Sequence, residues 1–323
     1  MKSNHLKRLA LAGAMLAASS SWATQEEFSI GTAAAPWLKL PKSARSAAMG
    51  DAFAAVADSV DTLGVNPAGL ANFSDRQLSV NHDIWIQEIS SDRVAYGQPI
   101  AGGGIGAAFD YVNFGSIPTY TLDAGGKPVA GAALNPMAMA ITLGYAAKMA
   151  QISVGGSVKY LSEDLGAGAS TAVAGDLGLL WSSDPKGASV GVALQNVGSQ
   201  LNGFNLATNL KLGAAMLFDL SSSALRSKVE AAPADTFQAA IDVNLPTADG
   251  GSSSVNLGGE YWYQSVVAGR LGYRLANQGG LTGLVGFSAG VGFKLYQRIQ
   301  LDYAYLALGE LGNSNQISLL ARF

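Results

Sequence analysis

The sequence predicts an all-β fold, a transmembrane antiparallel β-barrel of about 14 strands. Three observations indicate this fold. Charged residues make up only 13% of the 323-residue chain, about half of the fraction usual in soluble proteins. Apolar and polar residues alternate over most of the chain after residue 75. Beyond Ala23, no apolar run is long enough to cross a bilayer as a helix.

Residues 1–23 resemble a secretory signal peptide. A basic start is followed by a short apolar core, residues 9–18, and by small residues that suit cleavage after Ala23. The basic residues are Lys2, Lys7 and Arg8. Because the apolar core is too short for a hydrocarbon layer of about 30 Å, a membrane anchor is the weaker interpretation. We therefore expect export from the cytoplasm and removal of this segment.

The composition excludes several functions. The chain has no cysteine, so it contains no disulfide, thiol nucleophile or thiolate metal site. Its net charge of -3 comes without a clustered basic face, which gives no indication of nucleic-acid binding. We expect no nucleic-acid partner, no metal and no cofactor.

The strands are predicted from their alternation. In Arg298–Tyr305, Ile299 and every second residue after it are apolar, whereas Arg298 and Asp302 lie on the polar face. Since no helices are predicted to cover the apolar face, a lipid-facing exterior and a water-facing lumen explain both faces. The predicted strands are Gln77–Ile89, Asp92–Ile100, Gly103–Phe114, Met137–Met149, Gln151–Leu161, Thr171–Ser182, Ala188–Asn196, Asn209–Leu220, Thr236–Leu245, Ser253–Tyr263, Ser265–Leu275, Thr282–Leu295, Arg298–Leu306 and Asn315–Phe323.

The links between these strands alternate in length. Links after even-numbered strands are mostly tight, as at Ala101-Gly102, whereas links after odd-numbered strands are often longer, as at Gly115–Pro136. Outer-membrane barrels have short periplasmic turns and longer outer loops, so both ends of the barrel are expected in the periplasm. The charges predicted to face the lumen are Asp176, Glu260, Arg270, Arg274, Arg298 and Asp302.

The last strand ends on an aromatic residue, Phe323, after regular alternation. This ending resembles the C-terminal signal that the outer-membrane barrel-assembly machinery reads. The alternative is a strand that simply ends the chain. The resemblance implies the assembly machinery and outer-membrane lipid as partners, and the bacterial outer membrane as the location after cleavage of the signal peptide.

Residues 24–74 are irregular and rich in alanine, and they contain three short motifs: Ser43-Ala44-Arg45, Met49–Phe53 and Asn66–Leu70. These motifs resemble the PorV/PorQ family within the FadL-like group of outer-membrane barrels. The resemblance implies a plug, residues 24–74, inside a barrel formed by residues 75–323. The implied plug motif consists of Arg45, Met49, Gly50, Asn66, Pro67 and Gly69. Small residues suit close approach to a barrel wall, whereas the alternative is a disordered periplasmic leader.

Residues that mimic catalytic sites are not expected to be catalytic. Gly286–Gly290 has the spacing of a nucleophile elbow but lies inside an alternating strand instead of a strand–turn–helix. Alternation places Ser288 on the inward face and His82 on the outward face. Gly102–Gly106 opens a strand, whereas a phosphate site needs a helix behind the glycines.

Two non-enzymatic functions remain open. The PorV/PorQ resemblance implies a role in type IX secretion, with cargo or secretion-system proteins as partners, and this is the favoured interpretation. The alternative is FadL-like transport of a hydrophobic ligand that leaves sideways at a strand kink. Gly155-Gly156 and Gly258-Gly259 are candidates for such a kink, although they equally suit packing against lumen contents.

Overall fold

The computed structural model describes residues 33–323 apart from 167, 184–186, 221–234, 248–250 and 277–283. The predicted signal peptide, the first residues of the predicted plug and Thr282 therefore lie outside the described residues. Within the described part of the chain, no helix is long and apolar enough to cross a membrane.

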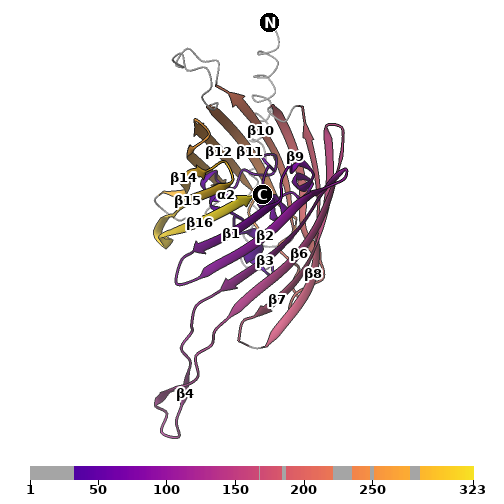
Figure 1. Cartoon of the computed structure of the whole chain (residues 1–323). Helices are drawn as coiled ribbons and strands as arrows, with labels where there is room; N and C mark the ends of the chain where they lie inside the picture. The colour runs from indigo at the N-terminus through magenta and orange to yellow at the C-terminus, as the bar shows by residue number, and fades with distance from the viewer. Residues whose placement is uncertain (1–32, 167, 184–186, 221–234, 248–250, 277–283) are drawn as a thin grey trace. The chain divides into compact units, whose positions relative to one another are not determined.

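Fourteen antiparallel strands close into one barrel (Figure 1), so the predicted all-β barrel of about 14 strands is confirmed. Nearly all neighbours in the barrel are neighbours in sequence, and β1 closes the barrel by pairing with β16. The barrel strands are β1 (Gln77–Ile84), β2 (Ser90–Ile100), β3 (Gly103–Asn113), β6 (Met137–Met149), β7 (Ile152–Asp164), β8 (Ala169–Ser182), β9 (Ala188–Gly198), β10 (Asn209–Asp219), β11 (Thr236–Pro246), β12 (Ser254–Tyr263), β13 (Val267–Ala276), β14 (Val285–Leu295), β15 (Ile299–Leu308) and β16 (Asn313–Arg322).

The link between β3 and β6 forms a hairpin of its own, β4 (Tyr120–Leu122) and β5 (Pro128–Ala130), which projects from one end of the barrel (Figure 1). This end, which also carries the links 199–208 and 247–253, is called the long-link end. The opposite end carries the tight turns Ala101-Gly102 and Ala150-Gln151 and is called the short-turn end. The short 3-10 helix η5 (Gly309–Leu311) lies in the link before β16.

Most predicted strand ends lie within three residues of the observed ends, and two predictions at strand ends need correction. The first strand ends at Ile84 instead of Ile89, because Gln87 and Glu88 have φ angles of 50° and 64° and a turn closes between Trp85 N and Ile89 O at 2.8 Å. Arg298 was predicted to begin a strand in the lumen, but it is exposed in the turn before β15.

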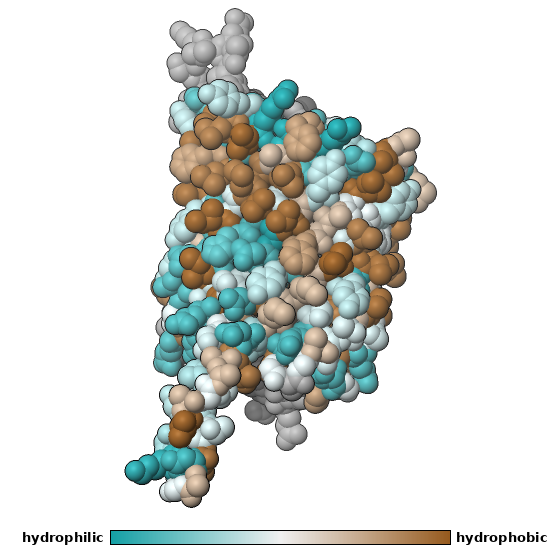
Figure 2. All heavy atoms as spheres, turned by 60° about the horizontal axis from the view of Figure 1, so that its bottom comes forward, coloured by the Kyte–Doolittle hydropathy of each residue, from teal (hydrophilic) through white to brown (hydrophobic). Residues whose placement is uncertain are grey.

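The barrel has a polar inside and an apolar outside. In β1, the buried residues are polar, including Gln77 and Asn81, whereas Leu78, Val80 and Ile84 are exposed. The same inversion recurs around the barrel, and hydrophobic side chains cover much of the outer face in Figure 2. A soluble sandwich would bury the apolar face; this arrangement instead suits a wall between lipid and a polar lumen.

The N-terminal segment, residues 33–74, lies inside the barrel and is mostly buried. Its elements are η2 (Pro36–Lys39), α2 (Ala44–Ala48), η3 (Val60–Gly64) and η4 (Pro67–Asn72). Ser43 begins α2 through a reciprocal capping box with Ser46, and the Asn66 side chain begins η4 by accepting a hydrogen bond from Ala68 N. α2 contacts β13–β16, whereas η4 contacts β2, β3 and β6–β8.

Inward glycines form the closest contacts between the wall and this segment. A Cβ at Gly155 would lie 2.5 Å from Ala68 N, and a Cβ at Gly258 would lie 2.5 Å from Met49 O. We call these residues the glycine belt: Gly104, Gly144, Gly155, Gly178, Gly191, Gly258, Gly272 and Gly290. At these positions, only a residue without a side chain lets the two backbones approach so closely.

Substitution of neighbouring glycines tests the belt. Gly155→Val should force the N-terminal segment from the wall, because overpacking costs about 1–3 kcal/mol, whereas Gly156→Val adds a side chain outside, 3.7 Å from Leu177. We expect trypsin to cut after Lys42 and Arg45 at least several-fold faster in Gly155→Val than in Gly156→Val, measured by mass spectrometry. Equal cleavage in two variants that both show the heat-dependent gel shift of a folded barrel would contradict the belt.

Candidate functional site

A chain of four buried charges links the N-terminal segment to the wall. Arg45, in α2, donates to both carboxylate oxygens of Glu260, in β12, at 2.8 and 2.7 Å. Glu260 also accepts from Arg270 Nε at 2.6 Å, and Arg270 Nη1 lies 2.8 Å from Asp302 Oδ1. Arg45 also forms a bidentate contact with Asp58 within the segment. The two-pronged geometry fixes the rotation of α2 as well as its position.

These charges depend on each other. Arg45, Glu260, Arg270 and Asp302 are each at most 7% exposed, and an isolated buried charge is costly. Burial alone would lower the pKa of Arg45, but Asp58 and Glu260 raise it above its ordinary value, so the guanidinium remains charged. Burial also lowers the pKa of Lys42 to about 8, and Asp110, 3.9 Å away, only partly opposes this.

Side chains of the wall also bond to the irregular backbone of the segment. Asp242, in β11, accepts from the backbone N of Phe53 and of Ala54, each at 2.9 Å. Gln195, in β9, donates to Val65 O at 2.9 Å. Lys211, in β10, pairs with the Asp51 carboxylate at 2.7 Å. The wall thus supplies partners that short 3-10 turns cannot provide for themselves.

The residues of the predicted plug motif lie at these contacts. Asn66 donates to Ala54 O at 2.9 Å and to Leu179 O of β8 at 3.1 Å. Pro67 is the first residue of η4, and Gly69 packs against Thr62. Met49 and Gly50 lie against Gly258 and Gly272. The φ of +65° at Gly50 is one that side-chain-bearing residues rarely adopt.

The predicted lumen charges divide into two groups. Glu260, Arg270 and Asp302 meet at Arg45, and Asp176 pairs with Lys159 at 2.8 Å. Arg274 borders a small cavity near the long-link end and is exposed, as is Arg298. The lumen face also carries buried charges outside the predicted set, although strand alternation places each of them inward: Asp83, Arg93, Asp110, Lys159, Glu163, Lys211 and Asp242.

The serine of the elbow-like motif bonds to the N-terminal segment, and His82 lies on the opposite face of the wall. Ser288 is 2% exposed, and its Oγ accepts from Gly50 N and donates to Ala48 O, each at 3.1 Å. His82 lies on the outer face, with its Nδ1 2.7 Å from Asp92 Oδ1. Among the described residues, no group of three or more metal-ligating side chains is placed to hold a metal ion.

Two cavities border the N-terminal segment. The larger has a volume of about 460 Å³, and residues next to the tight turns line it, including Lys148 and Gln151. The smaller is about 50 Å³ and lies near Asn209, Pro246 and Arg274 at the long-link end. The two cavities share no lining residue.

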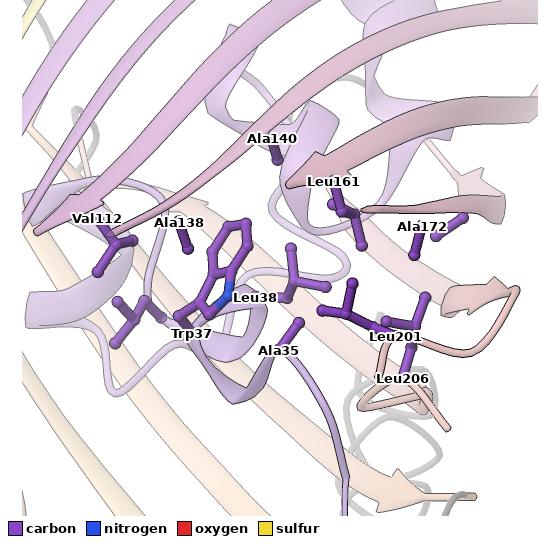
Figure 3. Packing of buried hydrophobic residues seen from close by; sticks show 12 residues of the cluster. Ala35, Trp37, Leu38, Val112, Ala138, Ala140, Leu161, Ala172, Leu201 and Leu206 are labelled. Carbon is purple, nitrogen blue, oxygen red and sulfur yellow. The ribbon is translucent and has the colours of Figure 1, made fainter. Parts of the chain in front are cut away.

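A cluster of packed apolar side chains lies near the long-link end of the barrel. Trp37 and Leu38 of the segment insert between the strand residues Val112, Ala138 and Leu161 on one side and a loop on the other (Figure 3). The loop contributes Leu201 and Leu206. We call this cluster the Trp37 chamber: Ala35, Trp37, Leu38, Leu40, Val112, Ala138, Ala140, Leu161, Ala172, Ala174, Leu201 and Leu206.

The chain folds as a closed fourteen-stranded barrel with a polar lumen. The chain belongs to the Uncharacterised protein family (UPF0164), whose model matches residues 10–318. No curated protein sequence matches the chain significantly. The FadL-like part of the predicted resemblance is therefore supported by the fold, whereas membership of the PorV/PorQ family is not shown.

Several solved transporters and channels share this fold. The toluene transporter TbuX of Ralstonia pickettii aligns with a TM-score of 0.56 and 15% identity over 87% of this chain and 98% of its own. The toluene transporter TodX of Pseudomonas putida aligns with a TM-score of 0.55 and 12% identity over 87% of this chain and 96% of its own. The CymD monoaromatic hydrocarbon channel aligns with a TM-score of 0.50 and 15% identity over 87% of this chain and 97% of its own. At such identities the likeness is one of fold.

The Arg45–Glu260 pair can be tested by a double-mutant cycle. Arg45→Met leaves a buried carboxylate with one fewer partner, which should lower the free energy of unfolding by about 3–5 kcal/mol. Combining it with Glu260→Gln should cost less than the sum of the two single changes, because their interaction is lost only once. Urea unfolding followed by tryptophan fluorescence measures each value.

The matched control is Arg298→Met, which removes an exposed guanidinium in the turn before β15. We expect its effect to stay within about 0.5 kcal/mol. An Arg45→Met protein that unfolds at the same urea concentration as the parent would show that the pair does not hold the segment.

Proposed function

We propose that the protein is a non-enzymatic outer-membrane channel that admits hydrophobic small molecules. The observation that carries this proposal is the shared fold with the toluene transporters over 87% of this chain. The polar lumen and apolar exterior fit a barrel in an outer membrane. The predicted transport function, given as the alternative to secretion, is thereby favoured.

In this proposal, residues 24–74 are the plug and residues 75–323 form the barrel after removal of residues 1–23. The separate cavities on the two sides of the segment support a plug, since they share no lining residue. Arg45, Met49, Gly50, Asn66, Pro67 and Gly69 are its anchoring residues. Irregular backbone at membrane depth requires protein partners of this kind.

The orientation follows from most of the link lengths; the link 220–235, which is long and lies at the short-turn end, is an exception. We place the short-turn end in the periplasm and the long-link end, with the β4–β5 hairpin, outside the cell. Phe323 bonds through its backbone with Arg76 beside β1 and is half-exposed, which leaves its ring available as the assembly signal.

The Trp37 chamber is the proposed entry site for an apolar molecule. Its side chains offer no charge, whereas the lumen wall beyond it is lined with ion pairs. Next to the chamber, the ladder between β8 and β9 is interrupted between Gly175 and Leu177, where Asn196 has a φ of 59°. A sideways exit at this bulge avoids the ion pairs deeper in the lumen. It passes the buried pair of Asp176 with Lys159, since Asn196 N donates to Asp176 Oδ1 at 2.8 Å. Gly155-Gly156, predicted as a kink, instead pair in regular register.

Uptake measurements test the proposal. Expression in a bacterial strain without its own FadL-like transporters should raise uptake of labelled toluene or long-chain fatty acid several-fold. Leu201→Asp should reduce this gain several-fold, because it places a charge in the Trp37 chamber, where Leu201 is fully buried. Phe204→Asp is the matched control, since Phe204 lies in the same loop and is 56% exposed. Unchanged uptake on expression would remove the transport proposal.

The secretion-associated role is less well supported than the transport function. Its motif is engaged inside the barrel, where Arg45 binds Glu260 and Asn66 binds Leu179 O, so packing alone accounts for these residues. Affinity purification from native membranes tests what remains. We expect no secretion-system component or secreted cargo to co-purify, and stoichiometric recovery of either would restore this interpretation.

A further inference from the structure

The larger cavity, called the vestibule, is unusually rich in cations. Four cationic side chains line it: Arg45, Lys148, Lys294 and Arg322. Two carboxylates line it as well, Asp58 and Glu260, and both are engaged by Arg45. The carboxylates are therefore largely neutralised, and the vestibule retains a positive potential.

Three of these cations are not neutralised by acidic groups. Among the described residues, no carboxylate lies within 4.0 Å of the charged groups of Lys148, Lys294 or Arg322. Lys148 donates instead to the neutral Asn72 side chain at 3.1 Å. Lys294 is held over the Trp262 ring, with its Nζ 3.9 Å from the centroid. An aromatic face positions a cation and leaves its donors free for an anion.

The size and remaining lining of the vestibule define the ligand. A volume of about 460 Å³ lies in the range of small-molecule sites. Leu180, Leu217 and Val56 add an apolar part beside the cations. We propose that the vestibule binds a small organic carboxylate, with its charge near Lys294 and Arg322 and its apolar part against these aliphatic side chains. This site lies at the other end from the Trp37 chamber and does not depend on the proposed transport of apolar molecules.

Calorimetry on the purified full-length barrel in detergent at low salt tests the site. Benzoate is the probe because it combines a carboxylate with a compact apolar ring, and benzyl alcohol is its neutral counterpart. We expect saturable benzoate binding that weakens as salt is added. Lys294→Gln and Arg322→Gln should each weaken it roughly tenfold, the effect of losing one hydrogen bond to a charged group.

The controls separate charge from folding. Lys294→Arg should retain binding within about threefold, because it keeps the cation over Trp262. Lys127→Gln, in the exposed β4–β5 turn, should leave binding unchanged. The site is overturned if benzoate does not bind, if benzyl alcohol or inorganic phosphate binds as well as benzoate, or if the folded Lys294→Gln and Arg322→Gln variants bind like the parent. If expression of the protein does not raise hydrocarbon uptake but the purified protein binds benzoate as expected, only the transport proposal is overturned.

Discussion

The structure depends on one constraint: irregular backbone inside a lipid-embedded barrel must find its hydrogen-bond partners within the protein. The N-terminal segment has only short helical turns, which leave many amide and carbonyl groups without local partners. Inward side chains supply them, as Asp242 does for Phe53 N and Ser318 does for Ala44 N at 2.6 Å. The polar lumen face and the irregular segment therefore stabilise each other.

This constraint also explains the small residues of the chain. Wall side chains reach the backbone of the segment only if the two surfaces come close, and the glycine belt provides that approach at Gly155, Gly258 and Gly272. Some of the 40 glycines of the sequence therefore occur where the N-terminal segment packs against the lumen wall. Exposed glycines such as Gly126, in the β4–β5 turn, serve backbone conformation instead, with a φ of 78°.

The sequence predicted the barrel strands well because a two-faced wall imposes a period of two on every strand. The β4–β5 hairpin was not predicted because it lacks this signal. All residues of both strands are exposed, so their two faces do not differ in polarity. Pairings across the lumen, such as Lys211 with Asp51, join segments far apart in the chain. Alternation shows that such side chains face inward but cannot show which one meets which.

The distribution of charge also constrains how anything passes this barrel. Moving the whole segment out of the lumen would break the pairs Arg45–Glu260 and Lys211–Asp51 and free the groups bound to Asp242. At about 3–5 kcal/mol for each broken buried pair, such a state is too rare to serve as a routine open form. A local rearrangement of Trp37 and Leu38 breaks none of these pairs, since both residues lie in the apolar chamber before α2. The same segment can thus stay anchored at the charged end and yield at the apolar end, which separates the two sites proposed for this protein.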